Sequence, residues 1–433
     1  MVTEYAPGMT RQAVERLSRQ YDEPAWLADA RLRAWQIFEM SPMPSRQDEE
    51  WRRTNPGGLR LDELVPFAEP SGQIESPLRL DGNVGGLITQ MNSVTTDRSL
   101  QDHIAEDGVI FTDLQTAACE HPDLVQRYFM TEAVNPEIGK FAALNAAYWS
   151  GGTFLYVPRG VEVVLPLRSL YGLTEGGIAT FGNTLLVLED GARATYIEEY
   201  VSPEIDRQSL NAGVVEAYVG QGAHLTFITL QDWAGKVWDV STQRALLGRD
   251  SRIDWLVINV GTGTTKTNIE TGLQGQGAFA QMLGIIWGAR NQHSDYHTVQ
   301  DHIAPHTTSD LLYKSALTDE AKSVFSGRIR VVQGAMGTDA YQANRNVLLS
   351  EKAAAFPSPN LEIEANEVRC THGATVGKID QDQLFYLMSR GIPRDMATRI
   401  VVEGFFEDVL QREPVASIRD NLRDLIGRKL DES

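Results

Sequence analysis

The feature that most constrains the fold of this chain is a weak internal repeat in its middle. A tight turn followed by a strand-like run begins at Gly191 and recurs at Gly222, Asp250 and Gly277, in steps of 31, 28 and 27 residues. A period of this length is typical of a chain that stacks one supersecondary unit on the next. Because each unit contains strand-like runs and no helical segment, the repeat predicts a parallel β-helix. A β-sandwich whose turns are evenly spaced by coincidence is the alternative.

Short runs of Val, Ile, Leu, Thr, Phe and Tyr alternate with Gly-containing turns from Gly151 onward. We predict strands at Thr153–Val157, Val161–Leu167, Thr184–Glu189, Ala194–Val201, Val214–Val219, Leu225–Leu230, Ile253–Val260 and Ala278–Ile286. No helical segments of ten or more residues separate these runs, which argues against βαβ units. The pattern therefore favours a mainly β protein.

Both ends of the chain are predicted to be helical. In the first 55 residues, apolar side chains recur at helical spacing, at Trp26, Leu27, Ala30, Ala34, Ile37 and Phe38. Asp29, Arg31 and Arg33 are expected on the other faces of that helix. After Asp380, one apolar stripe is formed by Met396, Ala397, Ile400, Val401, Phe405 and Val409. We expect the C-terminal helices to cap the open end of the stacked coils.

These patterns divide the chain into four predicted parts. Residues 1–84 form an N-terminal helical region and linker, and residues 85–150 form a mixed α/β lead-in. Residues 151–378 form the β-helix core, and residues 379–433 form a C-terminal helical region.

The charge balance excludes some classes of partner. The chain has 39 Lys and Arg against 58 Asp and Glu, so its formal net charge is −19. An acidic chain of this kind is not expected to bind a nucleic-acid backbone or an anionic membrane. Its two cysteines form no disulfide framework, which favours a reducing compartment. Because we find no signal peptide and no apolar run of about 20 residues, we expect a cytoplasmic protein.

A Cys-x-His pair near the end of the predicted core is the first candidate site. Cys370 and His372 are two residues apart, so in a strand both side chains lie on one face and can address one metal or cluster. Two ligands cannot complete a tetrahedral site, so the others would come from elsewhere, most simply from another chain. The alternative is a buried structural thiol beside a hydrogen-bonded histidine.

A second candidate is a group of four histidines within fourteen residues. Strand alternation would place His293 and His297 on one face, and His302 and His306 on one face. A metal-dependent enzyme could use such a set. The segment has no His-Glu-x-x-His motif and no His-x-His with a following Glu, so we favour structural side chains that bond to turn backbone. The metal-dependent enzyme remains the alternative.

Several segments together resemble the SufB/SufD family of iron–sulfur cluster assembly proteins. The matching segments are Glu23–Leu27, Phe141–Thr153, Val157–Val161, Val324–Ile329, Tyr341–Leu349, Cys370–Gly377 and Leu384–Ile392. The resemblance covers most of the chain. It implies a right-handed parallel β-helix core with helical N-terminal and C-terminal regions, in agreement with the repeat.

Within this family the chain is more similar to SufD than to SufB. SufB has a cysteine where this chain has Tyr200, and a glutamate where it has Gly373. The resemblance implies a scaffold subunit of a SufB–SufC–SufD complex and not a stand-alone enzyme. A SufB-type scaffold that works as a homodimer is the alternative, and Tyr200 argues against it.

The resemblance also implies partners and a cargo. The chain would pair with SufB along the β-helix, and its C-terminal helices would dock the ATPase SufC, whose ATP-driven dimerisation would strain the SufB interface. His372 would hold a transient iron–sulfur cluster shared with SufB, while the role of Cys370 as a ligand is less secure. The family resemblance allows reduced FAD on the complex, and a homodimer when the chain is expressed alone.

Overall fold

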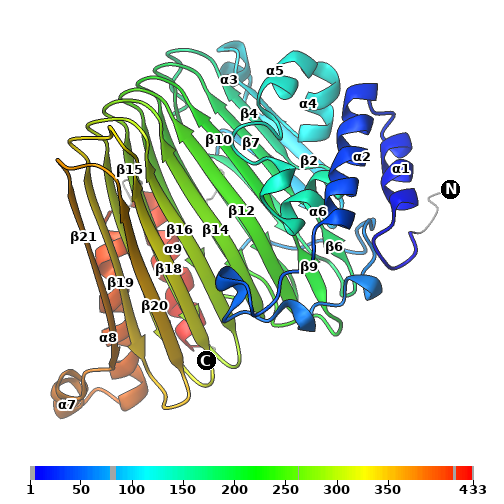
Figure 1. Ribbon diagram of the computed structural model, residues 1–433. Helices are drawn as coiled ribbons and strands as arrows, with labels where there is room; N and C mark the ends of the chain where they lie inside the picture. The colour runs from blue at the N-terminus through cyan, green and yellow to red at the C-terminus, as the bar shows by residue number, and fades with distance from the viewer. Residues whose placement is uncertain (1–4, 79–83, 262, 413–415, 432–433) are drawn as a thin grey trace.

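The computed structural model describes residues 5–78, 84–261, 263–412 and 416–431, and two long sheets dominate it (Figure 1). The strand order of the first sheet is β2 (Val94–Leu100), β1 (Gly86–Met91), β5 (Leu167–Gly172), β8 (Arg193–Val201), β11 (His224–Asp232), β13 (Arg252–Asn259), β15 (Phe279–Gly288), β17 (Thr308–Leu317), β19 (Asp339–Leu348) and β21 (Arg369–Lys378). From β10 to β21 the chain alternates between the two sheets and adds one parallel strand to each per coil.

The second sheet faces the first across the interior of the coils. Its strand order is β20 (Ala354–Ile363), β18 (Lys322–Val331), β16 (His293–His302), β14 (Thr264–Leu273), β12 (Val237–Leu247), β10 (Val214–Val219), β7 (Asn183–Leu188), β4 (Thr153–Val157) and β3 (Ile110–Thr112). Two short strands complete it, because β6 (Ala179–Thr180) pairs with β9 (Ser209–Asn211), and β9 pairs with β12. The predicted parallel β-helix is thus confirmed.

The repeat in the sequence corresponds to one corner of each coil. Arg193 pairs with His224, His224 with Arg252, and Arg252 with Phe279, so the first residues of successive strands are in register. Two residues before each of these strands, the backbone turns with a positive φ. This corner recurs at Gly191, Gly222, Asp250, Gly277, His306 and Gly337, with φ between 55° and 77°. Glycine and, less often, Asp or Asn adopt this conformation at low cost, which explains the turn signal in the sequence.

The interior of the coils is packed with apolar and aromatic side chains from both sheets. Tyr196, Phe227 and Trp255 occupy successive strands of the first sheet and contact one another at ring-centroid distances of 5.6 and 4.8 Å. Each such pair contributes about 0.5–1.5 kcal/mol beyond the apolar area that it buries. This aromatic file helps to hold the early coils in register.

The N-terminal helices are α1 (Arg11–Gln20), α2 (Ala25–Met40), α3 (Asp102–Glu106), α4 (Leu114–Glu120), α5 (Pro122–Tyr128) and α6 (Lys140–Tyr148), with short 3₁₀ turns η1 (Glu49–Trp51), η2 (Pro56–Gly58), η3 (Leu61–Glu63) and η4 (Pro136–Ile138). Most of these helices pack on the outer face of the second sheet, whereas α3 contributes Ile104 to the interior of the coils. In Figure 1, α2 and α6 lie over the early strands of this sheet. The predicted polar position of Arg31 on α2 is wrong: Arg31 is fully buried, with its guanidinium 2.6 Å from the Glu23 carboxylate.

The C-terminal helices are α7 (Gln381–Ser389), α8 (Arg394–Leu410) and α9 (Ala416–Asp431). Helices α8 and α9 lie across the outer face of the first sheet, and α7 lies at its end, where Leu384 is buried (Figure 1). Val402, Phe406 and Val409 of α8 are buried against this sheet, together with Leu422 and Leu425 of α9. The expectation that these helices cap the open end of the coils is wrong, because the outer faces of β11 to β17 carry the apolar side chains that bind them. No helix of the described residues is both long enough and apolar enough to span a membrane. The four-part domain division stays a prediction.

Candidate functional site

The Cys-x-His pair lies on β21, the last strand of the first sheet (Figure 1). Cys370 pairs with Ala340 of β19, and His372 pairs with Gln342. Ala340 and Gln342 are buried in the interior of the coil, so Cys370 and His372 continue this inward-facing row by one more step. His372 is exposed because, among the described residues, no further strand follows β21.

Cys370 is the less accessible member of the pair. Its side chain packs against an apolar cluster that includes Ile329, Val331 and Ala340. Burial raises the pKa of the Cys370 thiol, with a smaller contribution from the Asp339 carboxylate. Since a metal binds the thiolate, this environment makes Cys370 a weaker candidate ligand than His372.

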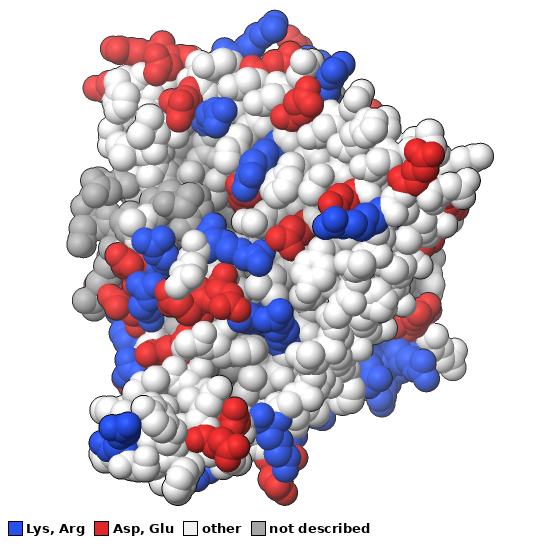
Figure 2. Space-filling view, turned by 90° about the vertical axis from the view of Figure 1, so that its left-hand side faces the viewer, with Lys and Arg blue, Asp and Glu red and all other residues white. Residues whose placement is uncertain are grey.

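The two strands of the last coil leave apolar side chains uncovered around the pair. Leu361 and Ile363 of β20 are 39% and 40% exposed, and Val376 of β21 is 45% exposed. Figure 2 shows this side of the molecule, with charged residues of both signs interspersed and a broad area of uncharged residues between them. Exposed apolar side chains on terminal strands are typical of a site that a partner covers.

The described residues bring no further ligand to Cys370 and His372. Within them, no three His, Cys, Asp or Glu side chains are placed to hold a metal ion together. If this pair holds a metal or cluster, the remaining ligands must therefore come from outside the described part of this chain.

The four clustered histidines have separate structural roles. His293 and His297 lie on β16. The His293 Nε2 atom lies 2.8 Å from the Thr54 hydroxyl, and the His297 Nε2 atom lies 3.1 Å from the Asp295 carboxylate. The Thr54 hydroxyl also donates a hydrogen bond to Asp295. The contacts of Thr54 with His293 and Asp295 help to fasten the N-terminal segment to the second sheet.

The other two histidines do not share a face of one strand, so that expectation is wrong. The strand ends at His302, whose ring is buried between the hydroxyls of Thr307 and Ser309, at 2.7 and 2.8 Å. Burial lowers the pKa of His302 to about 4, which keeps the ring neutral. His306 occupies a corner with a φ of 58°. The structure therefore does not assemble the four histidines into one metal site.

The position at which SufB would have a cysteine is buried inside the β-helix. Tyr200 is 4% exposed and stacks on Tyr171 at a centroid distance of 5.1 Å. Beside it, the Glu198 carboxyl accepts hydrogen bonds from Thr184 and Tyr196. The Asp239 carboxyl accepts hydrogen bonds from Asn211 and Gln231, each at 2.6 Å.

Burial raises the pKa of both carboxyls, of Glu198 to about 7 and of Asp239 to about 7. This buried polar group is absent from the predictions made from the sequence. The sequence pattern that could have revealed it is strand alternation, because Glu198 shares the inward face of β8 with Tyr196 and Tyr200.

Replacing Glu198 with glutamine is expected to stabilise the protein increasingly as the pH rises. The folded state keeps the Glu198 proton up to about pH 7, whereas an ordinary glutamate loses it near 4.5. The stability of the wild type therefore falls between these values and levels off above them. Glutamine resembles the protonated form and is spared this loss, on the order of 3 kcal/mol. Urea unfolding at pH 5 and pH 8 measures the effect. Glu106→Gln is the control, because Glu106 is exposed, and its free energy of unfolding is expected to follow that of the wild type at both pH values. An equal gain in the stability of Glu198→Gln at pH 5 and pH 8 would contradict the prediction.

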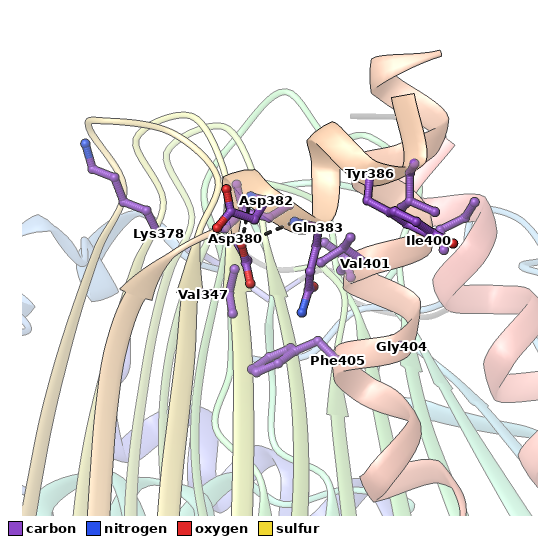
Figure 3. Close-up of a pocket in the computed structure, with 13 residues that line it drawn as sticks. Val347, Lys378, Asp380, Asp382, Gln383, Tyr386, Ile400, Val401, Gly404 and Phe405 are labelled. Carbon is purple, nitrogen blue, oxygen red and sulfur yellow. Dashed lines mark hydrogen bonds between the residues drawn. The ribbon is translucent and has the colours of Figure 1, made fainter. Parts of the chain in front are cut away.

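A groove of about 740 Å³ lies where α7 and α8 meet the end of the first sheet. Figure 3 shows Val347 from β19, Tyr386 from α7, and Ile400, Val401 and Phe405 from α8 around it. Further apolar side chains of the same helices are exposed, namely Phe385 (74%), Met388 (41%) and Met396 (56%). Only part of the predicted α8 stripe faces outward: Ile400 is 40% exposed, whereas Val409 is fully buried.

The structure thus defines a β-helix with an uncovered terminal coil and exposed apolar C-terminal helices. Comparison with protein families assigns it more closely. The model described as "SUF system FeS cluster assembly, SufBD core domain" matches residues 171–405, and "SufBD protein N-terminal region" matches residues 12–168. The chain belongs to the SufBD family of iron–sulfur cluster assembly proteins, which confirms the resemblance seen in the sequence.

Individual relatives agree with this assignment. The chain is 32% identical to the iron–sulfur cluster assembly protein SufD of Bacillus subtilis, over 97% of this chain and 98% of the relative. It is 29% identical to SufB of the same organism, over 94% and 90% of the two chains. A SufBD family protein of Staphylococcus aureus is also 29% identical, with the same coverage.

Proposed function

We propose that this chain is a SufD-like scaffold subunit that contributes one ligand to an iron–sulfur cluster assembled at its interface with SufB. The observation that carries the proposal is the position of His372: an exposed imidazole on the last strand of the β-helix, with no third ligand in the described part of the chain. A site of this kind is completed only by a partner.

Three properties favour a SufD-type role over a SufB-type homodimeric scaffold. Tyr200 replaces the thiol expected of SufB, and it is buried and stacked, so it offers no nucleophile for sulfur. Gly373 stands where SufB has a glutamate. Of the two Bacillus subtilis relatives, the one named SufD is more similar to this chain.

The chemistry of His372 suits a cluster that is built and then passed on. A neutral imidazole adds no negative charge to the cluster, unlike a thiolate, so it donates less electron density to the iron. Cys370 is a second possible ligand from the same face, with a thiol that its buried environment keeps protonated. The cluster is the cargo of the complex, and reduced FAD at the level of the complex stays a prediction from the resemblance.

The groove between α7, α8 and the first sheet is our proposed docking site for SufC. Its lining is mostly apolar and includes Tyr386, which is 57% exposed, and the neighbouring residue Phe385 is 74% exposed. Large exposed apolar side chains around a concave surface are typical of protein–protein contact sites. A metal-dependent enzyme built on the clustered histidines has no comparable support, because their rings bond to different groups.

The purified chain alone is expected to retain no stable iron–sulfur cluster, whereas the chain purified with SufB and SufC is expected to retain one. The reason is the ligand count, since Cys370 and His372 supply at most two of the ligands that a cluster needs. Anaerobic reconstitution followed by absorption spectra and iron and sulfide analysis measures both samples. A stoichiometric cluster on the monomer would show that the site is not shared, and would overturn the proposal.

A further inference from the structure

The residue beside His372 in the interior of the β-helix is a buried glutamine. Gln342 of β19 is 1% exposed and pairs with His372 of β21, so the two side chains lie on the same face of adjacent strands. The backbones of neighbouring strands lie about 4.8 Å apart. The Gln342 side chain is therefore the inner neighbour of the His372 imidazole.

The amide group of Gln342 reaches the second sheet. Its Nε2 atom donates to the backbone carbonyl of Gly327 on β18, at 3.4 Å, and to that of Asn360 on β20, at 3.2 Å. Strand β20 belongs to the last coil, as β21 does, so the amide lies between the last coil and the coil before it. The two carbonyls also fix which end of the amide is the nitrogen, because a carbonyl oxygen accepts hydrogen bonds and cannot donate them.

The carbonyl oxygen of the same amide has no partner. Gln342 Oε1 is buried and accepts no hydrogen bond from the described residues. Gly327 makes room for this oxygen, because a methyl group at position 327 would collide with it. An unpaired buried acceptor costs about 1–3 kcal/mol, so native proteins leave few of them without a donor. The residue paired with Gln342 toward the open end, His372, carries a ring N–H that can supply one.

We propose that Gln342 is a positioning residue for His372, and that its Oε1 atom accepts a hydrogen bond from the ring N–H of His372 that faces into the coil. An imidazole that binds metal through one nitrogen carries its proton on the other, and the acceptor of that proton sets the tautomer and the orientation of the ring. With the inner nitrogen held by Gln342, the outer nitrogen of His372 is directed out of the coil. The inference rests on the proposed function, in which that outer nitrogen binds the cluster.

A partner that covers the last coil strengthens this contact. His372 is exposed in the single chain, so water competes with Gln342 for the ring N–H. When the coil end is covered, water is excluded and a hydrogen bond between the two side chains becomes stronger. The orientation of the ring is therefore fixed in the complex, where the cluster is assembled.

A second buried glutamine provides a matched control. Gln300 of β16 is also fully buried, and its Nε2 atom donates to Ser309 Oγ and to the backbone carbonyl of Tyr341. Its Oε1 atom likewise has no partner among the described residues. Strand β18 separates β16 from the last coil, and Gln300 is not in register with His372. Loss of either amide is expected to disturb the interior, but only loss of Gln342 is expected to affect His372.

The rate at which an iron chelator removes the cluster tests the proposal. Each variant is purified without oxygen as a complex with co-expressed SufB-type and SufC chains, and the loss of cluster absorption is followed. Gln342→Met keeps the length of the side chain and removes the amide, and it is expected to lose the cluster about tenfold faster than the wild type. Gln300→Met is expected to behave as the wild type does. Gln342→Glu, which keeps a carbonyl oxygen, is expected to restore most of the wild-type rate.

Further comparisons separate positioning from a structural role. In the His372→Ala background, addition of Gln342→Met is expected to cause no further loss, because Gln342 acts only through the imidazole. Urea unfolding is expected to show similar losses of stability for Gln342→Met and Gln300→Met. Gly327→Ala keeps Gln342 and displaces its carbonyl oxygen, so it is expected to speed the loss of cluster as Gln342→Met does.

The outcomes distinguish this proposal from the proposed function. A wild-type rate in Gln342→Met, or in Gly327→Ala where Gln342→Met does not assemble, would overturn the positioning role and leave the scaffold function intact. An equally fast loss in Gln300→Met, or an additive loss in the His372→Ala background, would do the same. If His372→Ala itself loses the cluster no faster than the wild type, both the positioning role and the ligand role are overturned.

Discussion

Replacing His372 with alanine is expected to lower the iron and sulfide content of the purified complex by about tenfold or more, since loss of even an outer-shell partner of a metal ligand costs 10–100-fold in affinity. The fold and the assembly of the complex are expected to be unchanged, because the His372 side chain is exposed and packs in no core cluster. Iron and sulfide analysis of complexes purified without oxygen measures the effect, and cluster-dependent growth gives a second readout.

Two neighbours on the same strand provide the controls. The side chain of Thr371 is exposed on the opposite face of β21, so Thr371→Ala is expected to leave the cluster content unchanged. Cys370→Ser is expected to have an effect between these two, since its thiol is partly buried and held protonated. If the His372→Ala complex holds as much cluster as the wild type, His372 is not a ligand, and the chain contributes only architecture.

Truncation of Phe406 is expected to destabilise the protein by about 3–5 kcal/mol, a large share of the 5–15 kcal/mol typical of a folded domain. Phe406 is fully buried between α8 and the first sheet, so alanine would leave a cavity among apolar neighbours. The midpoint of urea unfolding measures the loss. Phe385→Ala on α7 is the matched control, because Phe385 is 74% exposed. The free energy of unfolding of this variant is expected to stay within about 0.5 kcal/mol of that of the wild type.

The same two positions separate stability from docking. Phe385→Asp is expected to abolish co-purification of SufC, because it places a charge on the exposed apolar side of α7, next in sequence to Tyr386 of the groove. Its unfolding midpoint is expected to remain that of the wild type. Point variants suit this question better than deletion of the C-terminal helices, which would uncover the apolar face of the first sheet. Retained SufC binding by Phe385→Asp would place the docking site elsewhere.

The apolar strands of the β-helix could be predicted from the sequence, and the polar ones could not. The predicted strands at Thr153–Val157 and Val214–Val219 coincide with β4 and β10. Strand β16, in contrast, contains three histidines and two aspartates among its ten residues and was interpreted as a cluster of possible metal ligands. Hydrogen bonds to β14 and β18 on its two sides hold it as a strand, and that contribution is not visible in local sequence.

The prediction of one strand was wrong, and the predicted repeat stopped one corner short of His306, for different physical reasons. Most of Val161–Leu167 lies before β5, which begins only at Leu167, directly after Pro166; proline is expected at the start of a strand rather than within it. The repeat was followed only to Gly277 because the next corner has His306 in the left-handed conformation, where glycine would have given the signal.

The two residues of the candidate site could be predicted from the sequence, but their location at the end of the β-helix could not. The spacing of Cys370 and His372 indicated one shared face, and the pairing of β21 with β19 agrees with it. That β21 is the last strand of the first sheet depends on how the whole chain winds. The groove at α7 likewise required the structure, because the apolar stripe of α8 is divided between the first sheet and the surface.

The placement of α8 and α9 has a mechanical consequence. Their apolar side chains share one cluster with Ile197, Ile228, Leu256, Ile285, Leu312 and Ala343, which lie on six successive strands from β8 to β19. The two helices therefore pack across several coils at once. The Lys314–Asp408 and Lys429–Asp232 ion pairs fix them to the first sheet at two separate points. The two helices thus tie together six coils that otherwise contact only their immediate neighbours.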